Sequence, residues 1–266
     1  MTSGIIDEND KSTFYCKCTN SVFITKDTAI LEFPWPGHPP RAGQFFLIKP
    51  RRTGVFLGRP ISVAGWFPSL EAAGSGTVRF IVAQRGRGSW ELTDMKAGEE
   101  AELIGPLGNC WKIADIPQGP VALVGGGIGI APLLALIPEL GDRVFDFYAG
   151  FRSGSFGLEN MESKAPRLRS LIIAAEDGSA GKSGRIPDYF TPTGYSGVFA
   201  CGPEPMLKVI SEACAAWKVP CFISMERHMA CGVGACLGCT VKTTGGNRRC
   251  CADGPVFNAS EVLFNE

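Results

Sequence analysis

The chain has 266 residues, of which 45% are hydrophobic and 20% are charged, as in soluble globular proteins. Lysine plus arginine and aspartate plus glutamate both number 26, so the net charge is zero. A chain of this composition does not fit wholesale disorder, and it lacks the basic field that binds a phosphate backbone, which argues against nucleic-acid binding. The length fits one large domain or two to three small ones.

The first ten residues lack the basic start and apolar run of a signal peptide. We therefore expect a reducing, cytoplasmic location, where clustered cysteines bind metal rather than form disulfides. An uncharged run from residue 116 to 138 has the length of a membrane span but contains five glycines and four prolines. These interruptions favour a buried strand, a glycine turn and a helix start, so we expect no membrane span.

The first 110 or so residues have the pattern of an antiparallel β-barrel. Short apolar segments, most of them followed by turn residues, are the strand candidates: 14–18, 29–33, 44–48, 61–64, 78–82 and 101–104. After residue 117 the pattern changes to apolar runs separated by helix-length segments, which predicts a parallel sheet: 121–124, 144–148, 171–175 and 197–200. The predicted organisation is a flexible extension, a barrel domain, an α/β domain and a small cysteine-rich domain: 1–11, 12–115, 116–222 and 223–266.

Five of the eleven cysteines lie close to the carboxyl terminus. Cys231, Cys236 and Cys239 follow the spacing C-x4-C-x2-C, and Cys250 and Cys251 come later. This is the plant-type [2Fe–2S] arrangement. Glycines at 232, 234 and 238 permit the close approach and positive φ that such a loop needs. The sequence therefore predicts a cluster loop.

A structural zinc site is the rival interpretation of these cysteines. Zinc sites of this kind usually pair two separate knuckles, each formed by two cysteines that lie two to four residues apart; only Cys236 and Cys239 form one here, and the second knuckle is missing. The spacing therefore favours [2Fe–2S]. From spacing alone the fourth ligand is either Cys250 or Cys251, because the two are adjacent.

Two glycine turns are expected at the carboxyl edge of the parallel sheet, where α/β proteins bind ligands. The first follows the run 121–124, and its glycines are Gly125, Gly126, Gly127 and Gly129. It does not complete G-x-G-x-x-G, because Ile130 stands at the third glycine position, and a turn made only for packing is the alternative. The second turn, Cys201-Gly202, ends the run 197–200.

Two segments of the barrel offer phosphate-binding groups. The segment 59–62 places the guanidinium of Arg59 before the hydroxyl of Ser62 at the start of a strand. The segment 86–89 combines backbone amides with the guanidinium of Arg87. The alternative is that both segments are surface hairpins. Their residues are Arg59, Pro60, Ile61, Ser62, Gly86, Arg87, Gly88 and Ser89.

Taken in order, these motifs resemble the ferredoxin–NADP reductase superfamily with an appended cluster. Within it, the chain most resembles the electron-transfer subunits of NAD-linked, two-subunit dihydroorotate dehydrogenases, from about residue 12 to the end. Besides the motifs above, the resemblance rests on the segments 105–108, 130–132, 176–179, 203–207, 225–230 and 252–257.

The resemblance implies a role for each motif. The two barrel segments would hold FAD, with Ser62 near its reactive nitrogen, and Ser62 and Cys201 are the catalytic candidates. The glycines of the first turn and Gly202 would face the nicotinamide nucleotide. The last cluster ligand precedes x-Asp-Gly-Pro, which selects Cys251. Glu176 and Asp177 stand where NADP-specific relatives carry serine and arginine, and two carboxylates there would repel a 2′-phosphate, which favours NAD.

The resemblance also implies the activity. Dihydroorotate would reduce FMN in a catalytic partner, and electrons would pass through [2Fe–2S] and FAD to NAD in de novo pyrimidine biosynthesis. A flavin is needed because nicotinamide carries hydride and the cluster carries single electrons. We expect a heterotetramer of two plus two subunits and an exposed cluster loop. Met225, Met229, Val233 and Leu237 are the candidates for partner contacts, and packing beneath the loop is the alternative for these four. The alternatives are a stand-alone NAD(P)H-dependent flavin/[2Fe–2S] reductase serving a ferredoxin or oxygenase, and a zinc-binding interaction module.

Overall fold

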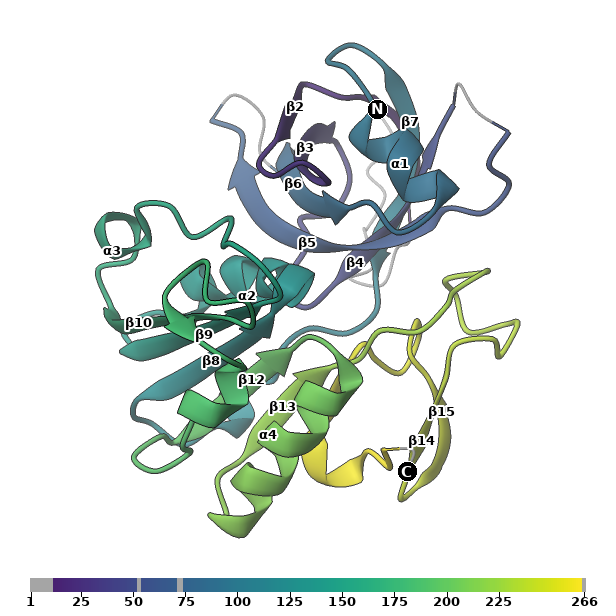
Figure 1. Ribbon diagram of the computed structural model, residues 1–266. Helices are drawn as coiled ribbons and strands as arrows, with labels where there is room; N and C mark the ends of the chain where they lie inside the picture. The colour runs from purple at the N-terminus through teal and green to yellow at the C-terminus, as the bar shows by residue number, and fades with distance from the viewer. Residues whose placement is uncertain (1–11, 52–53, 71–73, 265–266) are drawn as a thin grey trace.

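The computed structural model describes residues 12–51, 54–70 and 74–264. The predicted extension 1–11 lies outside them. Figure 1 shows a curved sheet in the first part of the chain, a layered α/β part below it, and a carboxyl-terminal segment along one side. No helix in the described part of the chain has the length and hydrophobicity that a bilayer span requires.

The amino-terminal part is a seven-stranded antiparallel sheet with the order β1-β7-β4-β5-β6-β3-β2. Its interior is filled by buried apolar side chains, among them Leu31, Phe33, Phe46 and Phe80. All six predicted strands are present, whereas β2 and the helix α1 were not predicted. The elements are β1 (Ser12–Lys17), β2 (Asn20–Phe23), β3 (Thr28–Trp35), β4 (Phe45–Pro50), β5 (Arg59–Pro68), β6 (Gly76–Ala83), α1 (Arg87–Thr93) and β7 (Glu100–Leu107).

The second part is a parallel sheet with the order β11-β10-β9-β8-β12-β13-β16, in which only β16 is antiparallel. All four predicted apolar runs are strands. The strands are β8 (Val121–Gly126), β9 (Phe145–Phe151), β10 (Leu168–Ala175), β11 (Lys182–Ser183), β12 (Gly197–Cys201), β13 (Cys221–Ser224) and β16 (Val256–Asn258). The helices are α2 (Ile130–Leu136), α3 (Met161–Lys164) and α4 (Glu204–Ala216).

Helices cover both faces of this sheet. Leu123 of β8 packs in the core cluster that contains Leu133 of α2, and Val124 packs in the cluster that contains Leu207 of α4. The strand order reverses between β8 and β12, and such a switch point is where open α/β sheets bind ligands.

The carboxyl-terminal segment is tied to both other parts. It contains a two-stranded hairpin, β14 (Thr240–Thr243) and β15 (Gly246–Arg249), and then returns as β16 to pair with β13. The boundary proposed at 222/223 falls within β13. Asn109, just after the barrel, donates from its side-chain amide to the carbonyls of Asp253 and Val256 at 3.0 and 2.8 Å. The cysteine loop is therefore anchored beside the barrel and the parallel sheet.

Candidate functional site

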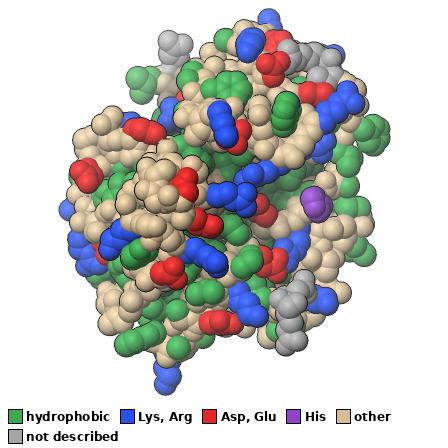
Figure 2. Space-filling model, viewed as in Figure 1, with side chains coloured by type: hydrophobic (Ala, Val, Ile, Leu, Met, Phe, Trp, Pro, Cys, Tyr) green, Lys and Arg blue, Asp and Glu red, His purple; other side chains and the backbone are tan. Residues whose placement is uncertain are grey.

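A cleft of about 770 Å³ lies between the barrel and the parallel sheet. Cofactor and small-molecule sites commonly occupy about 300–1,000 Å³. Figure 2 shows a hollow on this side of the molecule, with basic side chains beside it. Eight residues singled out in the sequence line its barrel side: Arg59, Pro60, Ile61, Ser62, Gly86, Arg87, Gly88 and Ser89. The size and the guanidinium groups of this cleft fit a flavin dinucleotide.

Gly88 brings the loop backbone against the guanidinium of Arg59. A Cβ atom added at Gly88 would lie 2.0 Å from Nε of Arg59. The hydroxyl of Ser89 accepts hydrogen bonds from the N–H groups of Arg85 and Gly86 at 2.8 and 3.1 Å, and it donates to the Gly86 carbonyl. Ser89 thus fixes the conformation of the loop. The loop backbone and the guanidinium of Arg59 are then available to bind an anion.

Gly88→Ala is expected to weaken FAD binding by about tenfold or more, equivalent to about 1.4 kcal/mol, because the added methyl group displaces the Arg59 guanidinium. Fluorescence titration of the flavin-free protein with FAD measures this. Gly86→Ala is the matched control for folding, because a Cβ there meets nothing within 4 Å. Equal FAD affinity in wild type and Gly88→Ala would show that the contact between Arg59 and Gly88 is not needed for binding.

The opposite wall of the cleft was not predicted from the sequence. It includes six consecutive residues, Ser224, Met225, Glu226, Arg227, His228 and Met229. Arg227 forms an ion pair with Glu204 at the start of α4, at 2.9 Å. The available signal was the apolar run 221–223, which is one more strand of the parallel sheet and directs the following residues to its carboxyl edge.

The two glycine turns meet at the switch point between β8 and β12. Gly125 pairs with Cys201 across the two strands. A Cβ atom added at Gly129 would lie 2.3 Å from the Cys201 carbonyl oxygen, and one at Gly202 would lie 2.9 Å from the Gly126 nitrogen. The turns are therefore in backbone contact, an approach that side chains would prevent. The open edge that they form fits the phosphates of a nucleotide.

Ser62 and Cys201, the catalytic candidates, lie in different surroundings. Ser62 lines the flavin cleft. Cys201 is only 1% exposed and does not line it. Burial raises the pKa of the Cys201 thiol well above its usual value, so the thiol stays protonated at neutral pH. In these surroundings Cys201 can shape the edge of the nucleotide site but is not activated as a nucleophile.

Glu176 and Asp177 follow β10 at the same edge of the sheet, and both are exposed. Asp177 accepts hydrogen bonds from the hydroxyl and the N–H of Ser179, at 2.5 and 3.0 Å. Hydrogen bonds from Ser179 and Ser153 lower the pKa of Asp177 to about 2. Asp177 is thus negatively charged at neutral pH, as the argument for NAD requires.

The cysteine loop directs backbone N–H groups at sulfur atoms. The N–H groups of Cys236 and Val233 both lie 3.5 Å from Sγ of Cys231, and they lower the pKa of that thiol to about 6. The N–H of Gly234 donates to Sγ of Cys251 at 3.1 Å. Gly232 and Gly234 have positive φ, whereas Gly238 does not, and Leu237 adopts a φ of 60° instead. These amides fit thiolate ligands.

The sulfur atoms lie in two pairs. The thiols of Cys231 and Cys236 are within hydrogen-bond reach of each other, as are those of Cys239 and Cys251. The described residues contain no group of three His, Cys, Asp or Glu side chains placed for one metal ion. Two pairs of thiols match a [2Fe–2S] cluster, in which each iron takes two protein ligands.

Cys250 and Cys251 point to different partners. Sγ of Cys250 donates to the Met225 carbonyl at 3.0 Å, toward the flavin cleft. Sγ of Cys251 faces Gly234 and Cys239 within the cluster loop. Burial raises the pKa of both thiols to about 12, so their acidities do not separate them. The hydrogen bonds favour Cys251 as the fourth ligand.

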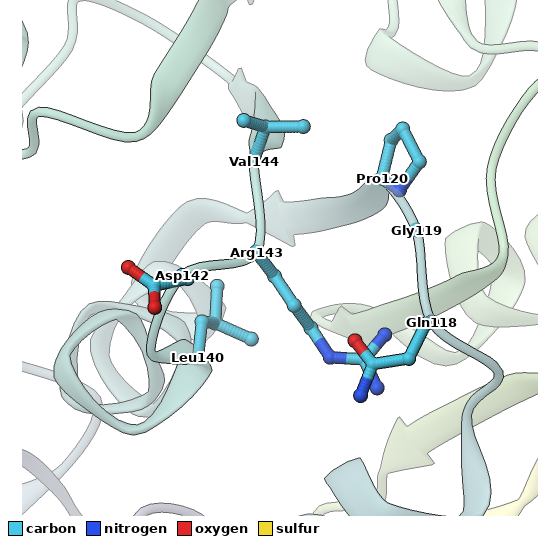
Figure 3. A pocket seen from close by; sticks show the side chains of 7 residues that line it. All are labelled: Gln118, Gly119, Pro120, Leu140, Asp142, Arg143 and Val144. Atoms are coloured by element: carbon cyan, nitrogen blue, oxygen red, sulfur yellow. The ribbon is translucent and has the colours of Figure 1, made fainter.

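A separate pocket lies at the amino ends of β8 and β9 (Figure 3). Arg143 lines it and donates to the carbonyls of Pro117 and Ile116 at 2.6 and 2.8 Å. None of the residues predicted from the sequence as site residues lines this pocket. Arg143 thus holds the linker segment that connects the barrel to β8.

Comparisons with known proteins agree with this arrangement. Residues 226–263 match the family model of the iron-sulfur cluster binding domain of dihydroorotate dehydrogenase B. A solved structure described as an NADH-dependent reduced ferredoxin-NADP oxidoreductase superposes with a TM-score of 0.78 and 27% identity, covering 94% of this chain and 90% of that chain.

Two curated relatives carry the name dihydroorotate dehydrogenase B (NAD(+)), electron transfer subunit. The protein from Clostridium acetobutylicum is 41% identical over 226 residues, which cover 85% of this chain and 87% of the relative. The protein from Clostridium perfringens is 45% identical over 227 residues, which cover 84% and 87%. The chain therefore belongs to the family of electron transfer subunits of NAD-linked dihydroorotate dehydrogenase B.

Proposed function

We propose that this chain accepts electrons from a catalytic subunit that oxidises dihydroorotate and passes them to NAD, within de novo pyrimidine biosynthesis. The observation that carries the proposal is the continuity of one segment. Residues 224–229 line the flavin cleft, and the cluster loop begins at Cys231. Ile128 of the first glycine turn lines the same cleft, so the cleft adjoins both the nucleotide turn and the segment that leads into the cluster loop, which supports a relay through a flavin.

Each group has residues suited to hold it. Arg59, Ser62 and the loop from Gly86 to Ser89 would hold FAD. The turns at Gly125–Gly129 and Cys201-Gly202, with Glu176 and Asp177, would hold NAD. Cys231, Cys236, Cys239 and Cys251 would ligate [2Fe–2S]. When bound, the flavin exchanges single electrons with the cluster and a hydride with nicotinamide, which links a one-electron carrier to a two-electron carrier.

The partner follows from the family, since an electron transfer subunit requires a catalytic one. We propose that this partner contains FMN and forms a heterotetramer of two plus two subunits with this chain. We also propose a cytoplasmic location, because none of the eleven cysteines, all of which lie in the described residues, forms a disulfide. A stand-alone reductase is the competing function, and the likeness to an NADH-dependent oxidoreductase is the observation that favours it.

Reconstitution separates these two functions. The isolated chain, loaded with FAD and cluster, is expected to oxidise NADH with an artificial acceptor and to leave dihydroorotate unchanged. Addition of the purified FMN-containing dihydroorotate dehydrogenase subunit from the same organism should produce NADH from dihydroorotate and NAD, followed at the NADH absorbance. Turnover of dihydroorotate by this chain alone, or no NADH after the subunit is added, would contradict the proposal.

A further inference from the structure

An ion pair encloses the cluster ligand Cys251 in a tight turn. The main-chain carbonyl of Arg249 accepts the N–H groups of Ala252 and Asp253 at 3.2 and 2.8 Å. In return, Oδ2 of Asp253 accepts the N–H of Arg249 at 2.7 Å. The two carboxylate oxygens of Asp253 also accept hydrogen bonds from Nε and Nη2 of the Arg249 guanidinium, both at 2.9 Å. A positive and a negative group are therefore fixed together beside the ligand.

The guanidinium of Arg249 faces the cluster loop with the edge that does not bind Asp253. A Cβ atom added at Gly234 would lie 3.5 Å from both Cδ and Nη1 of Arg249. The N–H of the same glycine donates to Sγ of Cys251 at 3.1 Å. Asp253 binds Nε and Nη2, on the opposite edge of the planar group. The positive member of the ion pair thus borders the cluster loop, with the carboxylate on the side away from Gly234.

The ligands nearest to this ion pair are the buried ones. The N–H of Cys251 lies 3.4 Å from Sγ of Cys239, and both cysteines are 1% exposed. Cys236, in the other pair of thiols, is exposed. Solvent screens a charge less where the group it acts on is buried. Arg249 is therefore placed to act on the Cys239 and Cys251 end of the cluster.

The cluster loop itself carries no charged side chain. Residues 229–241 contain no lysine, arginine, aspartate or glutamate. Of the four apolar residues predicted as partner contacts, Val233 and Leu237 are exposed on the loop, whereas Met225 is buried and Met229 lines the flavin cleft. Fixed charges that act on the cluster must therefore come from flanking segments, and Arg249 belongs to one that touches the loop.

We propose that the Arg249 guanidinium raises the reduction potential of the cluster, and that Asp253 limits this effect. This rests on the proposed function, in which Cys239 and Cys251 are ligands of a cluster that exchanges single electrons with the flavin. Reduction adds one negative charge to the cluster, so a fixed positive charge beside it favours the reduced state. An arginine suits this role because it stays protonated at every working pH.

Arg249→Gln is expected to lower the midpoint potential of the cluster, because the guanidinium is lost and the Asp253 carboxylate remains. The reduction equilibrium should shift by about tenfold, equivalent to about 59 mV for a one-electron carrier. Asp253→Asn should shift the potential in the opposite direction, because the guanidinium loses its counter-charge. A redox titration of the chain loaded with FAD and cluster, followed by the electron paramagnetic resonance of the reduced cluster, measures both shifts.

The matched controls separate charge from structure. Arg249→Lys keeps the positive charge and should keep a potential close to that of wild type. Arg248→Gln removes the same charge from the neighbouring residue of β15, which is exposed and points to the other face of the hairpin, and it should leave the potential unchanged. The ion pair is partly exposed, at 42% and 28%, so its loss should leave iron, sulfide and flavin contents equal to those of wild type.

Shifts of opposite sign in Arg249→Gln and Asp253→Asn support the proposal, because loss of a purely structural ion pair would move both variants in the same direction. Shifts of the same sign, no shift in either variant, or an equal shift in Arg248→Gln would overturn the role of Arg249 and leave the proposed function intact. If Arg249→Gln fails to hold the cluster, the sign of the shift in Asp253→Asn decides. A wild-type chain that binds no iron and sulfide would instead overturn the proposed function itself.

Discussion

Cys251→Ser is expected to abolish the [2Fe–2S] cluster. Cys251 completes the second pair of thiols with Cys239, and its sulfur accepts the N–H of Gly234 at 3.1 Å. A serine hydroxyl is far less acidic than a thiol and is a poor substitute for a thiolate ligand of iron. Iron and acid-labile sulfide should fall from two of each per chain to near zero, and the visible absorbance of the cluster should disappear.

Cys250→Ser is the control, and it should keep the cluster. A hydroxyl at residue 250 can still donate to the Met225 carbonyl, so the expected loss of stability is about 1 kcal/mol. Thermal unfolding of the loaded protein measures that loss. Loss of the cluster in Cys250→Ser with retention in Cys251→Ser would reverse the ligand assignment. Full occupancy by zinc without sulfide after anaerobic purification would reject the cluster altogether.

Exchanging Glu176 and Asp177 for serine and arginine should shift nucleotide preference toward NADP. The variant replaces charge repulsion with a guanidinium that can pair with the 2′-phosphate in a bidentate manner. We expect the ratio of kcat/KM for NADP over that for NAD to rise by about tenfold or more, equivalent to about 1.4 kcal/mol in the transition state. Steady-state kinetics with an artificial acceptor and each reduced nucleotide measures the ratio.

Asp177 also holds Ser179, so the double change disturbs the loop as well as the charge. Glu176→Ser alone is the matched variant, because Glu176 is exposed and takes no part in the hydrogen bonds that hold Ser179. This variant should raise the ratio of kcat/KM for NADP over that for NAD without disturbing the loop. A wild-type protein that already prefers NADP by about tenfold or more would show that the acidic pair does not set the choice.

Most of the sheet could be predicted from local patterns, and its last strands could not. The runs 121–124 and 197–200 are continuous, apolar and bounded by glycine, which is typical of strands buried on both faces. β16 has three residues, and its pairing with β13 joins residues more than thirty apart. A strand that short has no pattern of its own, so only the folded chain identifies it.

The residues of the candidate site likewise fall into those that local motifs predict and those that only tertiary packing brings together. Arg59, Gly88 and the three closely spaced cysteines were predicted because each motif is local and its chemistry depends on spacing. The wall from Ser224 to Met229 was missed because it meets the barrel only through tertiary packing. The conformation of the cluster loop was predicted in part, since the left-handed residue expected at Gly238 is Leu237. A leucine gives no signal for that conformation.

The return of β16 to β13 means that the carboxyl-terminal segment cannot be cut away to leave an intact remainder. A chain shortened to end after Ser224 would leave the main-chain groups of β13 that face β16 without their partners, on a strand whose four residues are all buried. Unpaired hydrophobic strand edges recruit other chains and aggregate. The iron-binding module is thus also the edge protection of the sheet, and a truncated protein should precipitate rather than behave as a smaller reductase.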